Sequence, residues 1–236
     1  MEHDIVDHHA WLRARKELLA REKQFTRARD EMTKAIRALP WEKVTKPYAF
    51  EGPGGRETLA GLFGSHRQLA VYHFMLGPGW AQGCPSCSFL ADSFDGTPVH
   101  LAERDVSFVA VSRAPLSEIQ AYQQRMQWRF KWVSSNGSDF NFDFGVSFPS
   151  SAPSNEDDPA TYNYTPMPGV GEEMPGASFF YKDGDDIYHT YSTYGRGLDI
   201  LIGTYNWLDL APKGRDEGDL EFTMSWIRRH DEYEQG

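Results

Sequence analysis

The chain has 236 residues, with 24 lysines and arginines against 34 aspartates and glutamates, so its formal net charge is −10. Charged residues make up 25% and apolar residues 40%, a mixture typical of a globular protein with a buried core. The acidic balance argues against nucleic acid and anionic membrane surfaces as partners. The longest apolar stretch, residues 69–76, is interrupted by His73 and is far shorter than the ~18 residues that a membrane span requires. Because the N-terminus also lacks a basic patch followed by an apolar stretch, we expect a cytoplasmic protein.

The first predicted element is a long helix over residues 8–39, with Asp7 as its N-cap. A large apolar side chain recurs every seven residues on one face of this helix: Trp11, Leu18, Phe25 and Met32. Its nine basic and four acidic residues give a charge of +5 and leave −15 for the rest of the chain. We interpret residues 1–40 as a helical extension that packs its apolar face on the acidic body. A partner-binding or dimer-forming arm is the alternative.

The chain contains only two cysteines, Cys84 and Cys87, separated by Pro85 and Ser86. A secreted disulfide scaffold would carry many more cysteines in a shorter chain. Residues 68–76 form an apolar stretch rich in valine and aromatics, as in a buried strand, and Gly77-Pro78-Gly79 ends it. Residues 84–94 then predict a helix with proline in its first turn. The order of strand, loop, CxxC and helix is that of a thioredoxin-like redox motif.

The position of the cysteines at a helix start predicts different roles for them. A helix N-terminus offers unpaired N–H groups and a partial positive charge, which favour the thiolate of Cys84. Cys87, one turn later on the same face, can attack the mixed disulfide that forms on Cys84. Half of a zinc site and two inert buried thiols are the alternatives. A zinc site would require a second CxxC or two histidines separated by three to five residues, and the body of the chain contains neither. We therefore expect no metal and no organic cofactor.

The rest of the chain alternates strand and helix, which predicts an α/β domain with a central sheet. The predicted helices cover residues 57–63, 98–104, 115–127 and 196–210, and the predicted strands cover residues 106–112, 131–135, 177–181 and 187–191. Phenylalanines alternate with polar residues over residues 140–148, which by periodicity indicates another strand. We expect a domain over residues 41–212, containing a proline-rich insertion at residues 149–175 and followed by a charged tail at residues 213–236.

Several stretches resemble a bacterial family of thioredoxin-like proteins of formally unknown function, described as predicted dithiol–disulfide oxidoreductases. The resemblance covers roughly residues 8–210, and its motifs are residues 71–75, 77–87, 134–140 and 189–197. It implies a thioredoxin-like fold with a central mixed sheet flanked by helices. By the same resemblance, residues 140–146 correspond to a short helix, against the strand that the periodicity indicates.

The wider thioredoxin pattern also implies site residues. Cys84 matches the attacking cysteine and Cys87 the resolving one. Pro175 matches the cis-proline that faces the dithiol and holds the substrate backbone, which predicts a cis Met174–Pro175 bond. We assign substrate contacts to Trp80, Gly83, Pro175 and Gly176.

Two departures from the superfamily pattern bear on the reaction. Thioredoxins place tryptophan directly before the first cysteine, where this chain has Gly83, with Trp80 further upstream. Peroxiredoxins carry threonine or serine three residues before their reactive cysteine, where this chain has Ala81, so efficient peroxide reduction of that type is disfavoured. His73 shares a strand face with Val71 and Met75, which indicates a core histidine rather than a proton acceptor.

The leading hypothesis is a thiol–disulfide oxidoreductase that exchanges two electrons with a disulfide-containing protein or a small-molecule thiol or disulfide. One alternative is a thiol-dependent peroxidase of peroxiredoxin-like type, in which Cys84 forms a sulfenate. The other is a non-enzymatic redox-responsive or metal-holding binding module. We expect no nucleic-acid or membrane partner, and the sequence leaves a homodimer open.

Overall fold

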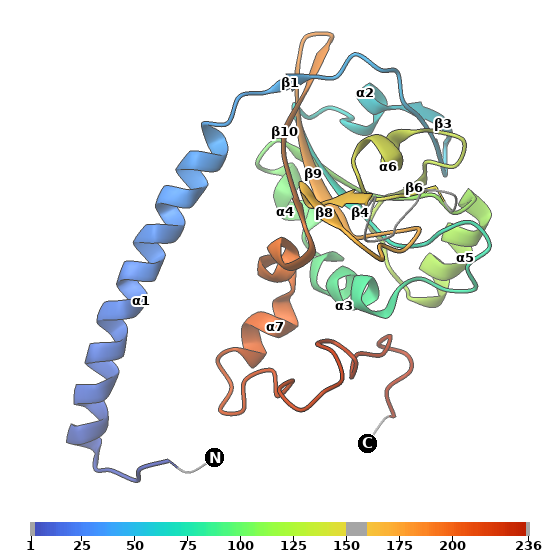
Figure 1. Ribbon diagram of the computed structural model, residues 1–236. Coiled ribbons are helices and arrows are strands. Elements are labelled where there is room, and N and C mark those ends of the chain that lie inside the picture. The colour runs from blue at the N-terminus through green and yellow to red at the C-terminus, as the bar shows by residue number, and fades with distance from the viewer. Residues whose placement is uncertain (1–2, 150–159, 235–236) are drawn as a thin grey trace. The chain divides into compact units, whose positions relative to one another are not determined.

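The computed structural model describes residues 3–149 and 160–234 and divides into two units, Met1–Pro40 and Trp41–Gly236. The first unit holds one continuous helix, α1 (His8–Arg37), drawn in blue in Figure 1. Asp7 is its N-cap and accepts a 2.7 Å hydrogen bond from the Ala10 N–H, so the predicted helix and cap are confirmed. None of its residues is buried, and the side chains of the seven-residue repeat are exposed. The packing of that face stays a prediction.

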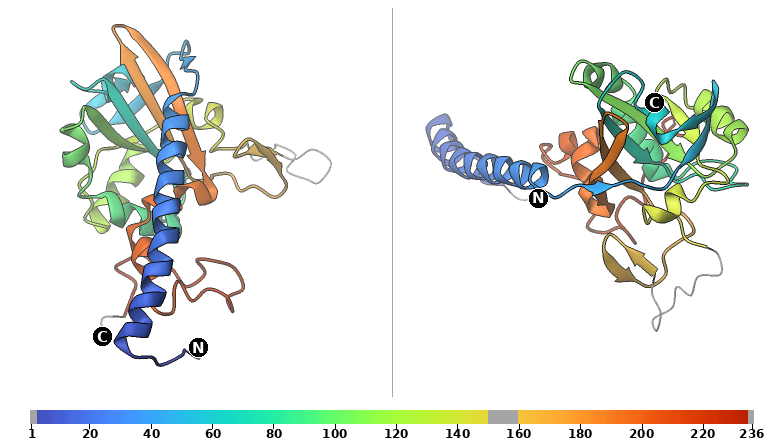
Figure 2. Two further views of the ribbon diagram at one scale, coloured as in Figure 1. Left: turned by 90° about the vertical axis from the view of Figure 1, so that its left-hand side faces the viewer. Right: turned by 90° about the horizontal axis from the view of Figure 1, so that it is seen from above.

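The second unit is built around an eight-stranded mixed sheet in the order β1-β10-β9-β4-β5-β6-β2-β3. Strands β4, β5 and β6 are parallel, and all other neighbours are antiparallel. The strands are β1 Glu42–Lys43, β2 Ala49–Gly52, β3 Gly55–Thr58, β4 Gln68–His73, β5 Val106–Ser112, β6 Trp132–Ser134, β9 Gly176–Asp183 and β10 Asp186–Tyr194. A separate short hairpin projects from this unit and consists of β7 Ala160–Tyr162 and β8 Thr165–Met167 (Figure 2).

Helices cover both faces of the sheet, and the alternation of side chains along β4 explains how. Tyr72 belongs to the core shared with α3, α5, the 3₁₀ helix η1 and α7, whereas Val71 belongs to the core shared with α2 and α6. The helices are α2 Leu59–Leu62, α3 Pro85–Phe94, α4 Pro98–Ala102, α5 Leu116–Arg125, α6 Phe140–Asp143, η1 Gly195–Leu201 and α7 Gly203–Leu208. Among the described residues, no helix combines the length and the apolar character needed to cross a membrane.

The connections around β4 define the fold. Helix α3 lies between the parallel strands β4 and β5 in sequence, and the β9–β10 hairpin adds to the other side of β4 in antiparallel register. The dithiol follows β4 and opens α3. This is a thioredoxin-like fold, so the predicted fold class is confirmed, as are the predicted strand at residues 106–112 and the helix after Pro115.

The strand predicted for residues 140–148 is wrong, because α6 begins there, as the family resemblance implied. Phe140 and Phe144 are four residues apart, and their ring centroids lie 4.7 Å from each other in the core that also contains Val71. Side chains four residues apart lie on one face of a helix, so the spacing of these two phenylalanines fits a helical turn as well as a strand. The sheet position beside β6 is occupied by β2, so residues 140–148 have no strand to pair with there.

Three other predicted segments differ in detail. Residues 55–58 pair with β2 as a hairpin, so the helix predicted for residues 57–63 shortens to α2. The helix predicted for residues 196–210 is interrupted at Ile202, whose extended backbone separates η1 from α7. The proline-rich insertion contains the β7–β8 hairpin, and its residues 150–159 lie outside the described part of the chain.

Candidate active site

The two cysteines lie where β4 ends and α3 begins. Cys84 is the N-cap of α3, and Pro85 is the first helical residue. The Cys84 N–H donates to the Met75 carbonyl at 3.1 Å, and the Cys84 carbonyl accepts from the Ser88 N–H at 3.0 Å and hydroxyl at 2.8 Å. Both thiols are free, with Cys84 partly exposed and Cys87 buried. The fold therefore presents one accessible thiol at a helix N-terminus and holds the other one turn deeper.

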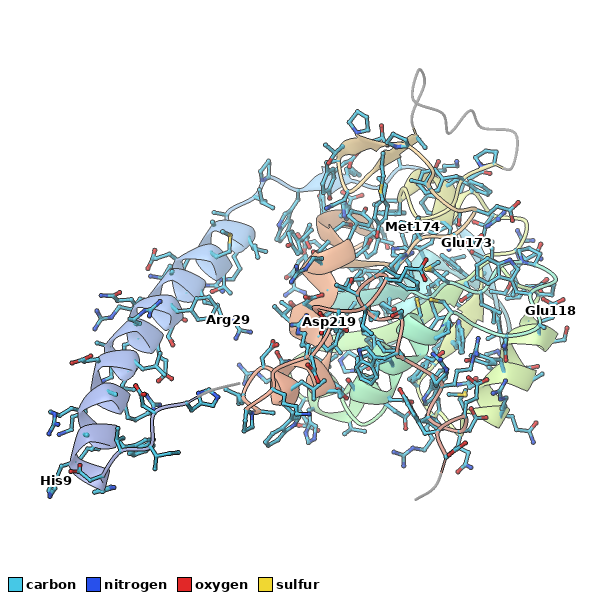
Figure 3. The ribbon with its side chains drawn as sticks, turned by 60° about the horizontal axis from the view of Figure 1, so that its bottom comes forward. His9, Arg29, Glu118, Glu173, Met174 and Asp219 are labelled. Atoms are coloured by element: carbon cyan, nitrogen blue, oxygen red, sulfur yellow. The ribbon has the colours of Figure 1, made fainter. Side chains whose placement is uncertain are left out.

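The loop that leads to the cysteines is fixed to the neighbouring helix. Glu118, in the first turn of α5, accepts a 3.1 Å hydrogen bond from the Gly79 N–H (Figure 3). Trp80 packs over the same loop, since a Cβ placed on Gly77 would lie 2.9 Å from the indole nitrogen. These contacts fix the conformation of the loop that precedes Cys84.

The surroundings separate the pKa values of the two thiols. A hydrogen bond from Cys87 lowers the pKa of Cys84 to about 6, with further contributions from the backbone N–H groups of Cys87 and Ser86 and from the positive charge of Arg229. Burial raises the pKa of Cys87, and the neighbouring Cys84 raises it further. The Tyr72 hydroxyl donates to Cys87 and opposes this rise. At neutral pH Cys84 is therefore a thiolate and Cys87 a thiol.

Arg229 is a buried cation that comes from the C-terminal segment, with only 8% of its side chain exposed. Its Nη2 and Nε donate to the Gly83 carbonyl at 2.5 and 3.2 Å, and Nε also donates to the Tyr122 hydroxyl at 3.0 Å. Glu232 accepts from its Nη1 at 3.1 Å. The C-terminal segment thus holds the backbone that immediately precedes Cys84. The sequence gives no signal for this role, because one arginine in a charged tail follows no pattern.

A cavity of about 240 Å³ lies beside the dithiol. Cys84, Cys87 and Pro175 share its wall with residues of η1 and of the C-terminal segment, including Leu198 and Met224. This arrangement places Pro175 on the same cavity wall as the dithiol, and its contact with substrate stays a prediction. Most of the wall is carbon, so the cavity suits a substrate group without charge.

Pro175 is held by its neighbours. Buried Glu173 accepts from Arg113 at 2.5 Å and from the Ser147 hydroxyl at 2.6 Å, and it lies beside Met174 in Figure 3. The Tyr162 hydroxyl donates to the Pro175 carbonyl at 2.6 Å. The Met174–Pro175 bond is trans, and no cis peptide bond occurs in residues 3–149 and 160–234, so the predicted cis isomer is wrong. These contacts hold the chain on both sides of Pro175, whose ring lies at the cavity wall.

None of the other predicted contact residues lines the cavity. Gly176 packs against Tyr194 and Val146, where a Cβ would meet ring and methyl carbons at 2.8 and 2.9 Å. Trp80 and Gly83 border the loop before Cys84 and do not line the cavity. Their contacts with substrate stay predictions.

His73 lies on the opposite face of β4 from Tyr72 and is only 1% exposed. Its Nε2 is 2.8 Å from the Ser178 hydroxyl, and its ring packs against Phe140 and Phe144. Burial lowers the pKa of His73 to about 3, so the ring is neutral at pH 7. The prediction of a core histidine is confirmed.

Gly83 leaves no room for a side chain. A Cβ there would lie 2.5 Å from the Phe74 ring and 2.7 Å from the Tyr122 ring. We expect Gly83→Ala to lower the free energy of unfolding by about 2 kcal/mol, because two packed rings must move. Urea unfolding measures the change. In the control Gly96→Ala the new Cβ meets nothing within 4 Å, so the change stays within about 0.5 kcal/mol. Equal losses in both variants would contradict this packing.

Comparison with known proteins places the chain in a family. Residues 1–233 match the DUF899 family, described as bacterial protein of unknown function. The chain belongs to this family. No protein with curated function matches it.

Solved structures with a similar arrangement are distant. Peroxidoxin BcpB from Mycobacterium tuberculosis is 15% identical with a TM-score of 0.47, over 70% of this chain and 94% of its own. The bacterioferritin comigratory protein of Xanthomonas campestris is 13% identical with a TM-score of 0.46, over 72% and 96%. A secreted Mycobacterium tuberculosis disulfide oxidoreductase is 18% identical with a TM-score of 0.37, over 66% and 92%. Similarities this distant do not identify a reaction.

Proposed function

We propose that this protein is a thiol–disulfide oxidoreductase with Cys84 as nucleophile and Cys87 as resolving thiol. The observation that carries the proposal is the asymmetry of the pair. Cys84 is partly exposed at a helix N-terminus with a pKa of about 6, whereas Cys87 is buried with a raised pKa. A buried structural pair would have no reason to stabilise one thiolate selectively.

The reaction proceeds in two exchanges. The Cys84 thiolate attacks one sulfur of a substrate R–S–S–R′, forming a Cys84–S–S–R mixed disulfide and releasing R′S⁻. That leaving thiolate takes the proton of Cys87. The Cys87 thiolate then attacks the Cys84 sulfur, releases RS⁻ and completes the Cys84–Cys87 disulfide. Two electrons pass to the substrate, and an external dithiol reductant returns two electrons to the pair.

The neighbouring residues support these steps. Tyr72 donates a hydrogen bond to Cys87 and so stabilises the thiolate that must form during resolution. Arg229 stabilises the Cys84 thiolate and fixes Gly83 beside it. Pro175, on the cavity wall, would limit how the substrate approaches the Cys84 sulfur, and Trp80, Gly83 and Gly176 would shape the surrounding surface.

The pH dependence of alkylation tests the proposal. We expect iodoacetamide to alkylate Cys84 in the reduced protein with a rate that rises with pH and reaches half its plateau near pH 6, because only the thiolate reacts. Cys87 should react more slowly and only in alkaline solution. Peptide mass spectrometry separates the two sites between pH 4 and pH 10. In the denatured control both thiols should titrate at about pH 8.5.

Two results would replace the proposal. Unshifted titration of both cysteines, together with stoichiometric zinc in the purified reduced protein, would indicate a metal-holding module. Consumption of hydrogen peroxide faster than reduction of any disulfide, with formation of the Cys84–Cys87 disulfide, would indicate a peroxidase. Ala81, which has no hydroxyl, speaks against that second reaction.

A further inference from the structure

We propose that the substrate of this dithiol is a small-molecule disulfide with an aliphatic chain, and that this alkyl chain lies in a second, apolar cavity that adjoins the dithiol pocket. This inference rests on the proposed function, because it concerns the substrate of the same site.

The second cavity has a volume of about 420 Å³. It lies on the Tyr72 face of the sheet, between strands β4, β5 and β9 and the elements α3, α4 and η1. Its wall is mainly aromatic and aliphatic and includes Ala70, Phe94, Leu101, Phe108, Phe179 and Leu201. Interiors normally contain few voids larger than a water molecule, whereas ligand cavities typically begin at about 300 Å³. The volume of this cavity therefore falls within the range of ligand cavities.

The two cavities share part of their walls. Tyr72 and Leu90 line both of them. On α3, Cys87, Leu90 and Phe94 follow at intervals of three and four residues, so they share one helix face. On β4, Ala70 and Tyr72 point to the same side of the sheet. These two rows lead from the dithiol to the second cavity over roughly 10 Å, the rise of seven helical residues.

Two of the four polar side chains on the wall, those of Gln68 and Ser93, already have hydrogen-bond partners. The Gln68 amide donates to the carbonyls of Arg104 and Asp105 at 3.2 and 3.4 Å. The Ser93 hydroxyl accepts from the Gly203 N–H at 3.0 Å. A ligand group that required hydrogen bonds would lose those that it made in water and would gain few on this mainly apolar wall. A peptide substrate would bring such groups with its backbone, so the wall favours an alkyl chain.

The reaction of Cys84 with alkyl methanethiosulfonates tests this inference. The Cys84 thiolate attacks the sulfenyl sulfur, forms an alkyl disulfide and releases methanesulfinate. The probes are the methyl, butyl and octyl reagents, and each rate is divided by the rate with glutathione. Each buried CH₂ adds up to roughly a fourfold gain in rate. We expect the octyl reagent to modify Cys84 at least about tenfold faster than the methyl reagent after this correction.

Two variants test where the alkyl chain of the reagent binds. Ala70→Phe places a ring inside the second cavity, and the octyl-to-methyl ratio should fall toward one. Thr97→Trp fills the cavity from its partly exposed edge and gives the same result if Ala70→Phe does not fold. Ala60→Phe is the matched control, because Ala60 is exposed on α2 at the other face of the sheet, and its ratio should equal that of the unmodified protein.

The outcomes separate this inference from the proposed function. An octyl-to-methyl ratio near one, with a fast reaction of the methyl reagent at pH 7, would overturn the proposal of an aliphatic substrate. It would leave the proposed oxidoreductase function standing. A high ratio that both cavity-filling variants retain would also overturn it, because the chain would then bind elsewhere. A slow methyl reaction, with Cys84 titrating like a free thiol, would overturn the proposed function itself.

Discussion

Cys84→Ser should abolish disulfide reduction, with a loss of at least about a thousandfold, because a serine hydroxyl does not ionise near neutral pH and cannot replace the thiolate. Cys87→Ser should also lose turnover, but for a different reason. Its Cys84 still attacks the substrate, and the mixed disulfide persists because no second thiol resolves it. A steady-state assay with a chromogenic disulfide measures the first effect, and intact-mass spectrometry measures the trapped adduct.

The two variants serve as controls for each other, since each removes one sulfur from the same short segment. One mixed-disulfide equivalent on Cys87→Ser and none on Cys84→Ser is the expected pair of results. The reverse pair would make Cys87 the nucleophile, against its burial and raised pKa. Full activity in Cys84→Ser would remove the dithiol from the reaction altogether.

The local part of the site could be predicted from the sequence, because its signals lie within a few residues of each other. The Gly77-Pro78-Gly79 break ends the strand, and Pro85 favours the first turn of the helix that follows. The unpaired backbone N–H groups of that first helical turn also stabilise the thiolate at its N-terminus. The segment from β4 to α3 therefore follows from sequence, together with the parallel strand β5.

Tertiary contacts decided the parts that the sequence could not predict. Tyr72 looks like any aromatic residue of a buried strand, and only the fold brings its hydroxyl to Cys87. Phe140 and Phe144 fit either a strand or a helical turn, and the occupied sheet edge selects the helix. Pro175 was placed at the dithiol by resemblance, but its bond to Met174 is trans, and the pattern does not predict that its carbonyl accepts from Tyr162.

Arg229 is the clearest case, since 146 residues separate it from the Gly83 carbonyl that it binds. Its guanidinium is almost fully buried, and it supplies a positive charge near Cys84. The Arg229 side chain therefore has two roles. Its hydrogen bonds hold the loop at Gly83, and its charge favours the Cys84 thiolate. Substitutions that separate hydrogen bonding from charge can tell these functions apart.

Arg229→Gln should raise the pKa of Cys84 above its value of about 6, so that the thiolate fraction and the rate of alkylation at pH 6 both fall. It should also lower the free energy of unfolding by about 3 kcal/mol, because the Gly83 carbonyl and the Tyr122 hydroxyl lose a buried charged partner. The alkylation profile of Cys84 measures the first effect, and urea unfolding the second.

Arg229→Lys keeps the charge but cannot reproduce the paired contacts of the guanidinium. We therefore expect it to retain most of the low Cys84 pKa while losing much of the stability. Arg228→Gln is the matched control, since Arg228 is exposed and its side chain donates to two carbonyls of its own turn, those of Ser225 and Ile227. If Arg229→Gln destabilises the protein but leaves the Cys84 profile unchanged, Arg229 only holds the loop. The low pKa of Cys84 would then come from Cys87 and the N-terminus of α3 alone.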